Sequence, residues 1–139
     1  MYKSNKKNLM KLTPIEVIDL SVLLGKDLIL DKVSCSIKNN SITAVIGPNG
    51  AGKSIFLQTI NGLTNIDNGK ITFNKIYNND EIRNKQAMVF QTPTLLRRNV
   101  KSNMDFVSNV KNKNGKLIIK NILKRVGLDG YDNKPARLL

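Results

Sequence analysis

Gly47-Pro48-Asn49-Gly50-Ala51-Gly52-Lys53-Ser54 is a glycine-rich segment that fits the pattern G-x-x-x-x-G-K-[ST]. Gly50 and Gly52 allow backbone dihedrals, and a close approach of a ligand, that other residues resist. Successive N–H groups of such a loop can point inward and hold an anion. Lys53 can reach the β- and γ-phosphates of a nucleotide as a cation, and the Ser54 hydroxyl can ligate Mg²⁺. The pattern therefore predicts a phosphate-binding loop.

The sequence on either side of the loop supports the same prediction. Residues 42–46 form a short apolar run, which predicts a buried strand that a turn then stops. Residues 53–63 predict a helix. Phe56, Ile60 and Leu63 are expected on one apolar stripe, which Leu57 widens. The beginning of this helix would add unsatisfied N–H groups and a positive dipole end to the anion site. We therefore expect a nucleoside triphosphate as the ligand, with ATP and Mg²⁺ as cofactors.

The remaining pattern predicts an α/β chain. Apolar runs or alternation predict strands at residues 15–22, 28–37, 70–73 and 87–90. Helical spacing follows at residues 99–110 and 116–126. In the second of these, Leu117, Ile118, Ile122 and Val126 are expected to share one face, with Leu123 at its edge. Strands and one helix thus come first, and helices follow.

Length and composition are those of an ordinary globular protein. The 139 residues allow one domain at most, with 40% hydrophobic residues. The net charge of +13 comes from lysines spread along the chain, so we interpret it as a solvated surface and expect no nucleic-acid partner. No stretch approaches the roughly 18 apolar residues of a membrane span. The single cysteine, Cys35, is expected to be a small buried hydrophobe in a reducing compartment.

Several segments together resemble the ATP-binding domains of ABC transporters. Residues 46–57 (IGPNGAGKSIFL) look like the Walker A region of these domains. Residues 30–34, followed by 42–46, resemble the lead-in to that loop, and residues 62–71 resemble the stretch after it. Met88-Val89-Phe90-Gln91 resembles the strand and glutamine of the Q-loop. The resemblance implies a P-loop NTPase core of ABC type, with a mixed sheet, helices and the start of a helical subdomain.

The resemblance also assigns roles to matching positions. Lys53 would contact the β- and γ-phosphates, and Ser54 would ligate Mg²⁺. Gln91 would contact Mg²⁺ or the attacking water and sense the γ-phosphate. Residues 1–13 would be a basic, disordered tail, residues 14–91 the ATP-binding lobe, and residues 92–139 the start of the helical subdomain that meets the permease.

Two positions depart from the family pattern near the loop. Leu24 stands near the position where an aromatic residue usually stacks on adenine, so it offers apolar contact without stacking. Ile55 replaces the hydroxyl residue that usually follows Ser54, which removes one expected hydrogen bond to the α-phosphate. Neither departure removes the phosphate cradle.

The parts of the family pattern that perform hydrolysis are missing from these 139 residues. No Ser-Gly-Gly occurs, the chain has no histidine, and the only Asp-Glu pair, Asp80-Glu81, follows polar residues. Residues 135–139 resemble the lead-in to the signature motif, so we expect a truncated domain that binds ATP and Mg²⁺ without hydrolysing ATP at a useful rate.

The function that the resemblance implies is that of the nucleotide-binding subunit of an ABC transporter, peripheral on the inner face of the plasma membrane in the cytoplasm. Residues 90–100 look most like importers of oxyanions (tungstate, molybdate or phosphate) or of amino acids. Expected partners are a membrane-spanning permease and a second ATP-binding subunit in a head-to-tail dimer. The alternative is an ABC-type ATPase of chromosome maintenance or repair, which the charge would suit. The Gly69-Lys70-Ile71 element and the absence of sustained heptads argue against it.

Overall fold

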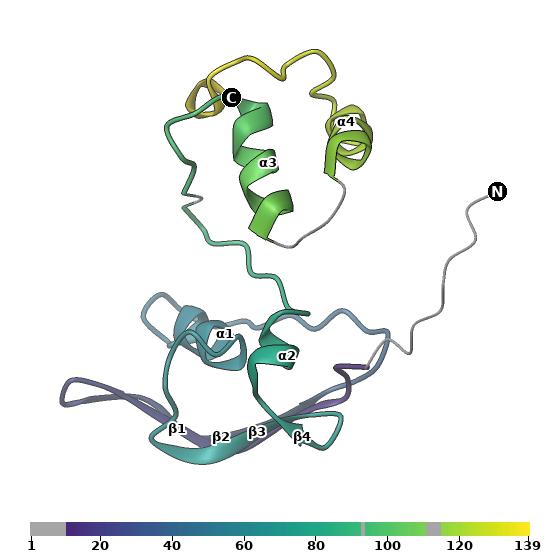
Figure 1. Cartoon of the computed structure of the whole chain (residues 1–139). Helices are drawn as coiled ribbons and strands as arrows, with labels where there is room; N and C mark the ends of the chain where they lie inside the picture. The colour runs from purple at the N-terminus through teal and green to yellow at the C-terminus, as the bar shows by residue number, and fades with distance from the viewer. Residues whose placement is uncertain (1–10, 93, 111–114) are drawn as a thin grey trace. The chain divides into compact units, whose positions relative to one another are not determined.

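The computed structural model describes residues 11–92, 94–110 and 115–139, and it divides the chain into two compact units, Met1–Met88 and Val89–Leu139 (Figure 1). Most of the predicted tail, residues 1–10, lies outside the described residues. The last part of that segment is structured, because Leu12 packs against the core of the first unit.

The first unit is built on a sheet with the strand order β2-β1-β3-β4, in which neighbouring strands are antiparallel. The strands are β1 (Ile15–Leu24), β2 (Asp27–Ile37), β3 (Asn68–Phe73) and β4 (Ile76–Tyr77). β1 and β2 form a hairpin through the two residues after Leu24, since Leu24 pairs with Asp27. The strands predicted at residues 15–22, 28–37 and 70–73 are therefore confirmed, each with a longer extent.

Two helices lie on the same face of this sheet, α1 (Lys53–Ile60) and α2 (Asp80–Arg83) (Figure 1). They bury apolar side chains with those of the strands in one core. Its members are Val17, Leu20, Val22, Leu30, Phe56, Ile60, Ile71, Phe73 and Ile82. The predicted stripe is thus confirmed for Phe56 and Ile60 only. Leu57 and Leu63 are 47% and 57% exposed, and the helix ends at Ile60, before it reaches Leu63. α1 ends before Gly62, whose positive φ of 77° suits the end of a helix.

The second unit consists of α3 (Val100–Val110), α4 (Gly115–Arg125) and the short 3₁₀ helix η1 (Ala136–Leu138). Its core is formed by Val100, Ile119, Leu123 and Ala136. The predicted apolar face of α4 is wrong where it can be compared, because Ile122 and Val126 are 41% and 61% exposed. Leu123, predicted only at the edge of that face, and Ile119, four residues before it, are the core residues of α4.

Two predicted strands are absent from the described residues. Residues 42–46 and 87–90 pair with no strand there, and Ile42, Ile46 and Val89 are each more than 90% exposed. A buried strand needs a neighbouring strand for its N–H and C=O groups, and within the described part of the chain neither run has one. Apolar character alone was therefore a misleading signal for these two runs.

The prediction for Cys35 is also wrong, since its side chain is exposed. Cys35 lies on β2, on the same face as Val33 and Ile37, and this face lines an open cleft instead of a closed core. Within residues 11–92, 94–110 and 115–139, no helix has both the length and the apolar character needed to cross a bilayer.

Candidate nucleotide-binding site

The glycines of the loop are held in left-handed backbone conformations that favour glycine. Gly50 has a φ of 83° and Gly52 a φ of 80°. A Cβ atom on Gly52 would lie 2.9 Å from Leu30 Cδ2 and 3.1 Å from the carbonyl oxygen of Ile29, whereas one on Gly50 would meet no atom within 4 Å. Gly52 thus allows the loop to pack closely on β2. At Gly50 only the positive φ favours glycine, because a side chain there would meet no neighbouring atom.

Lys53 is the cation of the loop, and its ammonium group points back into the loop. Nζ donates hydrogen bonds to the carbonyl oxygens of Gly47, at 2.9 Å, and Pro48, at 2.6 Å. The side chain therefore already lies beside the backbone that would surround a phosphate. Because both acceptors are carbonyl groups, the full positive charge remains available to an anion.

The remaining loop residues form an exposed turn. Pro48, Asn49 and Ala51 are exposed, and the Ala51 N–H donates to the Pro48 carbonyl at 3.3 Å. No side-chain hydrogen bond from Asn49 is among those of the described residues. These residues therefore contribute their backbone groups and the shape of the turn.

The beginning of α1 is open to an anion. Gly52 is its N-cap and supplies no side-chain hydrogen bond, and the first turn carries no acidic residue. The N–H groups and the positive end of the helix dipole are therefore not neutralised by the helix itself. This is the arrangement that binds phosphate groups at helix N-termini.

Ser54 lies in the first turn of α1 with its residue exposed. A hydroxyl oxygen is a suitable ligand for Mg²⁺, which binds proteins through few side chains and completes its shell with phosphate oxygens and water. Among the described residues, no group of three His, Cys, Asp or Glu side chains could hold a metal ion. The loop thus fits Mg²⁺ that arrives with a triphosphate.

Gln91 belongs to the second unit, and its residue is exposed. The structure therefore brings the loop residues 47–54 together, while a contact between Gln91 and the loop stays a prediction. Leu24, at the tip of the β1–β2 hairpin, is 45% exposed. Ile55 is partly buried against the core of the first unit, which gives it a packing role.

The acidic pair Asp80-Glu81 forms local ion pairs. Asp80 forms an ion pair with Arg83, and Glu81 one with Lys85 at 2.7 Å, on the exposed surface of α2. Neither carboxylate is near the end of a buried strand. The exclusion of this pair as a water-activating site agrees with these contacts.

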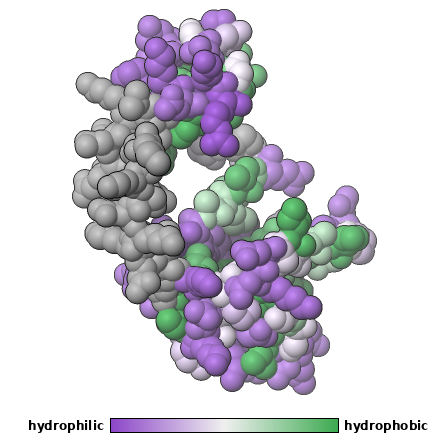
Figure 2. All heavy atoms as spheres, turned by 90° about the vertical axis from the view of Figure 1, so that its right-hand side faces the viewer, coloured by the Kyte–Doolittle hydropathy of each residue, from purple (hydrophilic) through white to green (hydrophobic). Residues whose placement is uncertain are grey.

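An apolar cleft of about 360 Å³ adjoins the loop and is a feature that the sequence did not reveal. Its walls include Val33, Ile37, Val45, Ile46 and Phe56, and its rim includes Ala51, Gly52 and Lys53. Hydrophobic residues are visible at the surface of the first unit (Figure 2). Apolar walls do not suit a triphosphate, so a phosphate contact at this cleft would come from Ala51, Gly52 and Lys53. The sequence feature that could have indicated this cleft is the apolar run at residues 42–46, because Val45 and Ile46 line it.

A glycine-rich loop of the pattern G-x-x-x-x-G-K-[ST] that opens a helix is the mark of a P-loop nucleotide-binding protein. The sequence model of the ABC transporter family matches residues 30–138, and the chain belongs to this family. This membership confirms the resemblance noted from the sequence.

Known relatives give the same assignment. The phosphate import ATP-binding protein PstB of Cytophaga hutchinsonii is 36% identical over 113 residues, which are 71% of this chain and 45% of that protein. The methionine import ATP-binding protein MetN of Clostridium tetani is 33% identical over 128 residues, 86% of this chain and 40% of that protein. The chain thus spans less than half the length of these relatives.

Solved structures confirm the predicted fold class. The structure of cbiO1 from Clostridium perfringens, part of the ABC transporter complex cbiONQ, is 28% identical with a TM-score of 0.73, over 90% of this chain and 55% of that one. An ATP-binding protein of a putative ABC transporter from Pyrococcus furiosus has the same fold, with a TM-score of 0.77 at 23% identity, over 91% and 63% of the two chains. The chain therefore has the α/β fold of an ABC-type P-loop NTPase core in part.

Proposed function

We propose that this chain binds ATP with Mg²⁺ through residues 47–54, as the nucleotide-binding part of an ABC importer subunit. The observation that carries the proposal is the position of the Lys53 ammonium group, 2.6 Å and 2.9 Å from two carbonyl oxygens of the loop that it serves. It stands beside the open beginning of α1, which carries no acidic residue in its first turn.

Each group of loop residues would make a different contact with the nucleotide. The glycines let backbone N–H groups approach the phosphate oxygens, and α1 adds its positive end. Lys53 neutralises part of the β- and γ-phosphate charge, and the Ser54 hydroxyl, together with Gln91, would hold Mg²⁺. The metal ion would draw charge from the phosphate oxygens when bound.

The names of the relatives support an importer. PstB is a phosphate import protein and MetN a methionine import protein, and both are ATP-binding proteins. We infer that this chain works with a membrane-spanning permease and a second ATP-binding subunit, on the cytoplasmic face of the plasma membrane. The nucleic-acid alternative is not favoured, because the matched family is one of transporters.

Titration with a fluorescent ATP analogue in the presence of Mg²⁺ tests the binding site. Loss of a hydrogen bond to a charged group costs about 1.5–3 kcal/mol, so Lys53→Ala should weaken binding about 10- to 150-fold. Lys70→Ala is the matched control, since Lys70 lies exposed on β3 and its loss changes the net charge equally. Equal weakening by both variants, or no saturable binding, would remove the proposal.

Steady-state ATP hydrolysis tests a separate part of the proposal. The 139 residues contain no histidine and no Ser-Gly-Gly, so we expect binding without the turnover of an intact transporter. A phosphate-release assay measures this directly. ATP turnover that is abolished by Lys53→Ala would contradict the expected lack of hydrolysis. It would not contradict the proposal that residues 47–54 bind ATP.

A further inference from the structure

Three arginines of the second unit line a single pocket that the proposed function does not use. Arg97, Arg98 and Arg137 surround a space of about 350 Å³, together with Asn99 and Pro135. All three arginines are exposed. No acidic residue lines the pocket.

Backbone hydrogen bonds fix the two segments that carry the arginines. The Ala136 N–H donates to the Arg98 carbonyl at 3.0 Å, and the Val100 N–H donates to the Lys134 carbonyl at 3.0 Å. Ala136 and Val100 are 4% and 6% exposed and belong to the core of this unit. The backbone of the arginine-bearing segments is thus held by hydrogen bonds and by the core of this unit. Its conformation does not depend on a bound ligand.

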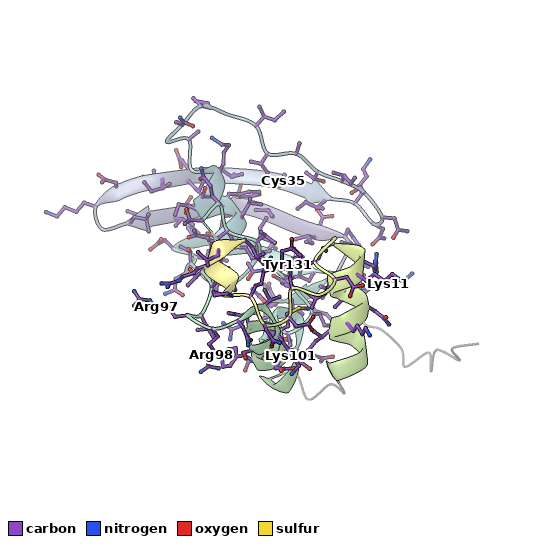
Figure 3. All side chains as sticks on the ribbon, turned by 90° about the horizontal axis from the view of Figure 1, so that it is seen from above. Lys11, Cys35, Arg97, Arg98, Lys101 and Tyr131 are labelled. Carbon is purple, nitrogen blue, oxygen red and sulfur yellow. The ribbon has the colours of Figure 1, made fainter. Side chains whose placement is uncertain are left out.

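Within the part of the chain that the structure describes, none of the three guanidinium groups forms an ion pair with a carboxylate. The nearby Lys101 is paired with Asp105 at 2.8 Å. Figure 3 shows Arg97 and Arg98 reaching outward on the same side of this unit. Residues 89–139 as a whole contain eleven lysines and arginines against three aspartates, so the field around the pocket is positive.

The beginning of α3 does not compete with the arginines as the anion site. The N–H groups of Val100, Lys101 and Ser102 already donate to the Lys134 carbonyl, the Asp132 carbonyl and the Asn99 side chain. The donors left for a ligand are therefore the guanidinium groups. Each presents N–H groups in a planar fork that matches the oxygens of a phosphate or carboxylate.

We propose that this pocket binds the phosphate group of a ligand that carries two or more negative charges. A single carboxylate would leave most of the charge of three guanidinium groups uncompensated, whereas a phosphate monoester or diphosphate balances it better. The phosphate group can belong to a soluble compound or to an anionic lipid headgroup. The pocket shares no residue with the loop at 47–54, so each set of residues can be substituted without changing the other.

Calorimetric titration of the full chain with pyrophosphate tests the site, in a Lys53→Ala background that weakens the loop. The combined variant Arg97→Gln, Arg98→Gln and Arg137→Gln should weaken binding at least tenfold. Lys26→Gln, Lys75→Gln and Lys120→Gln together form the control, because these exposed residues lie outside the pocket and remove the same charge. We expect the control to change affinity less than twofold.

Each of three results would exclude pyrophosphate as a ligand of the pocket: no saturable binding, equal loss in both combined variants, or disappearance of binding with Lys53→Ala alone. Equal loss would mean that bulk charge attracts the ligand. Circular dichroism checks that both combined variants keep the fold. Arg98→Lys keeps the charge and removes the fork, so a clear weakening with this variant supports recognition by guanidinium geometry.

Co-sedimentation with phosphatidylcholine vesicles that contain phosphatidic acid distinguishes the source of the phosphate. Arginine-dependent binding to the vesicles assigns the site to a headgroup. Arginine-dependent binding of pyrophosphate without vesicle binding assigns it to a soluble phosphate compound. Failure of both ligands to show arginine dependence excludes the site.

Discussion

The Lys53 ammonium group donates a hydrogen bond of 2.6 Å to the Pro48 carbonyl oxygen, across the loop that separates the two residues in sequence. A second bond, of 2.9 Å, reaches the Gly47 carbonyl. The lysine therefore braces the first turn of the loop as well as supplying its charge. A phosphate must compete with two neutral acceptors for this cation, and charge-assisted bonds to an anion are the stronger ones.

Alanine substitutions at Gly50 and Gly52 should differ in their effect on stability. Both residues have positive φ, and a left-handed conformation costs an L-residue about 1–2 kcal/mol. At Gly52 the new methyl group would also press against the Ile29 carbonyl and Leu30, and overpacking adds about 1–3 kcal/mol. Urea unfolding followed by circular dichroism measures the difference. Equal destabilisation would mean that the packing on β2 is not tight.

The sequence predicted features that local chemistry decides. The helix that follows the loop, Phe56 and Ile60 on its buried side, and the strands at residues 15–22 and 28–37 depend on neighbours close in the chain, and the structure contains them. Residues 42–46 required a partner strand, which no local pattern can report. The arginine pocket was missed for a similar reason, since Arg98 and Arg137 are brought together by backbone contacts between segments distant in sequence, such as the hydrogen bond from the Ala136 N–H to the Arg98 carbonyl.

The two cores should unfold separately when one of them is weakened. Ile82 is fully buried in the first core, and Leu123 is 3% exposed in the second. Truncation of either residue to alanine removes buried methyl groups at a cost of about 2–5 kcal/mol. Hydrogen exchange should show that Leu123→Ala speeds exchange in α3 and α4 and leaves β1 and β3 protected, with the reverse for Ile82→Ala. Uniform loss of protection by either variant would indicate one cooperative unit, and would reject the predicted lobes at residues 14–91 and 92–139.

The thiol of Cys35 should react slowly with alkylating agents at neutral pH. Partial burial, and then the negative charge of Glu16, raise the pKa of this thiol above its ordinary value. Because the thiolate is the reactive form, a raised pKa moves the increase in rate to higher pH. Glu16→Gln removes one cause, so its pH–rate profile for iodoacetamide should shift to lower pH. Asp31→Asn is the control, since Asp31 is on the same strand and does not contribute to the shift. An unchanged profile for Glu16→Gln would exclude the charge effect.

Asn103 holds the arginine-bearing segment to α3 through its side-chain amide. Its Oδ1 accepts from the Leu96 N–H at 2.9 Å. The two N–H groups of Nδ2 are shared among the carbonyls of Leu96, Arg98 and Asn99, whose oxygens lie 3.2, 3.3 and 3.0 Å from the nitrogen. Asn103→Asp replaces the donor with a carboxylate oxygen that faces these carbonyls. Each unsatisfied partner costs about 1–3 kcal/mol when buried and less at this partly exposed site, so we expect a loss of about 1 kcal/mol at neutral pH.

The loss of stability caused by Asn103→Asp should grow as the pH rises. Repulsion by the carbonyls raises the pKa of the introduced carboxyl group above its unfolded value of about 3.9, so the protonated form, which can donate, is favoured in the folded state. The variant should therefore approach the stability of the unchanged chain below pH 4 and lose it as the pH rises through the folded pKa. Urea midpoints from pH 3 to 7 measure this, relative to the unchanged chain. Asn121→Asp, an exposed position on α4, should show no such trend, and a parallel trend there would assign the effect to net charge.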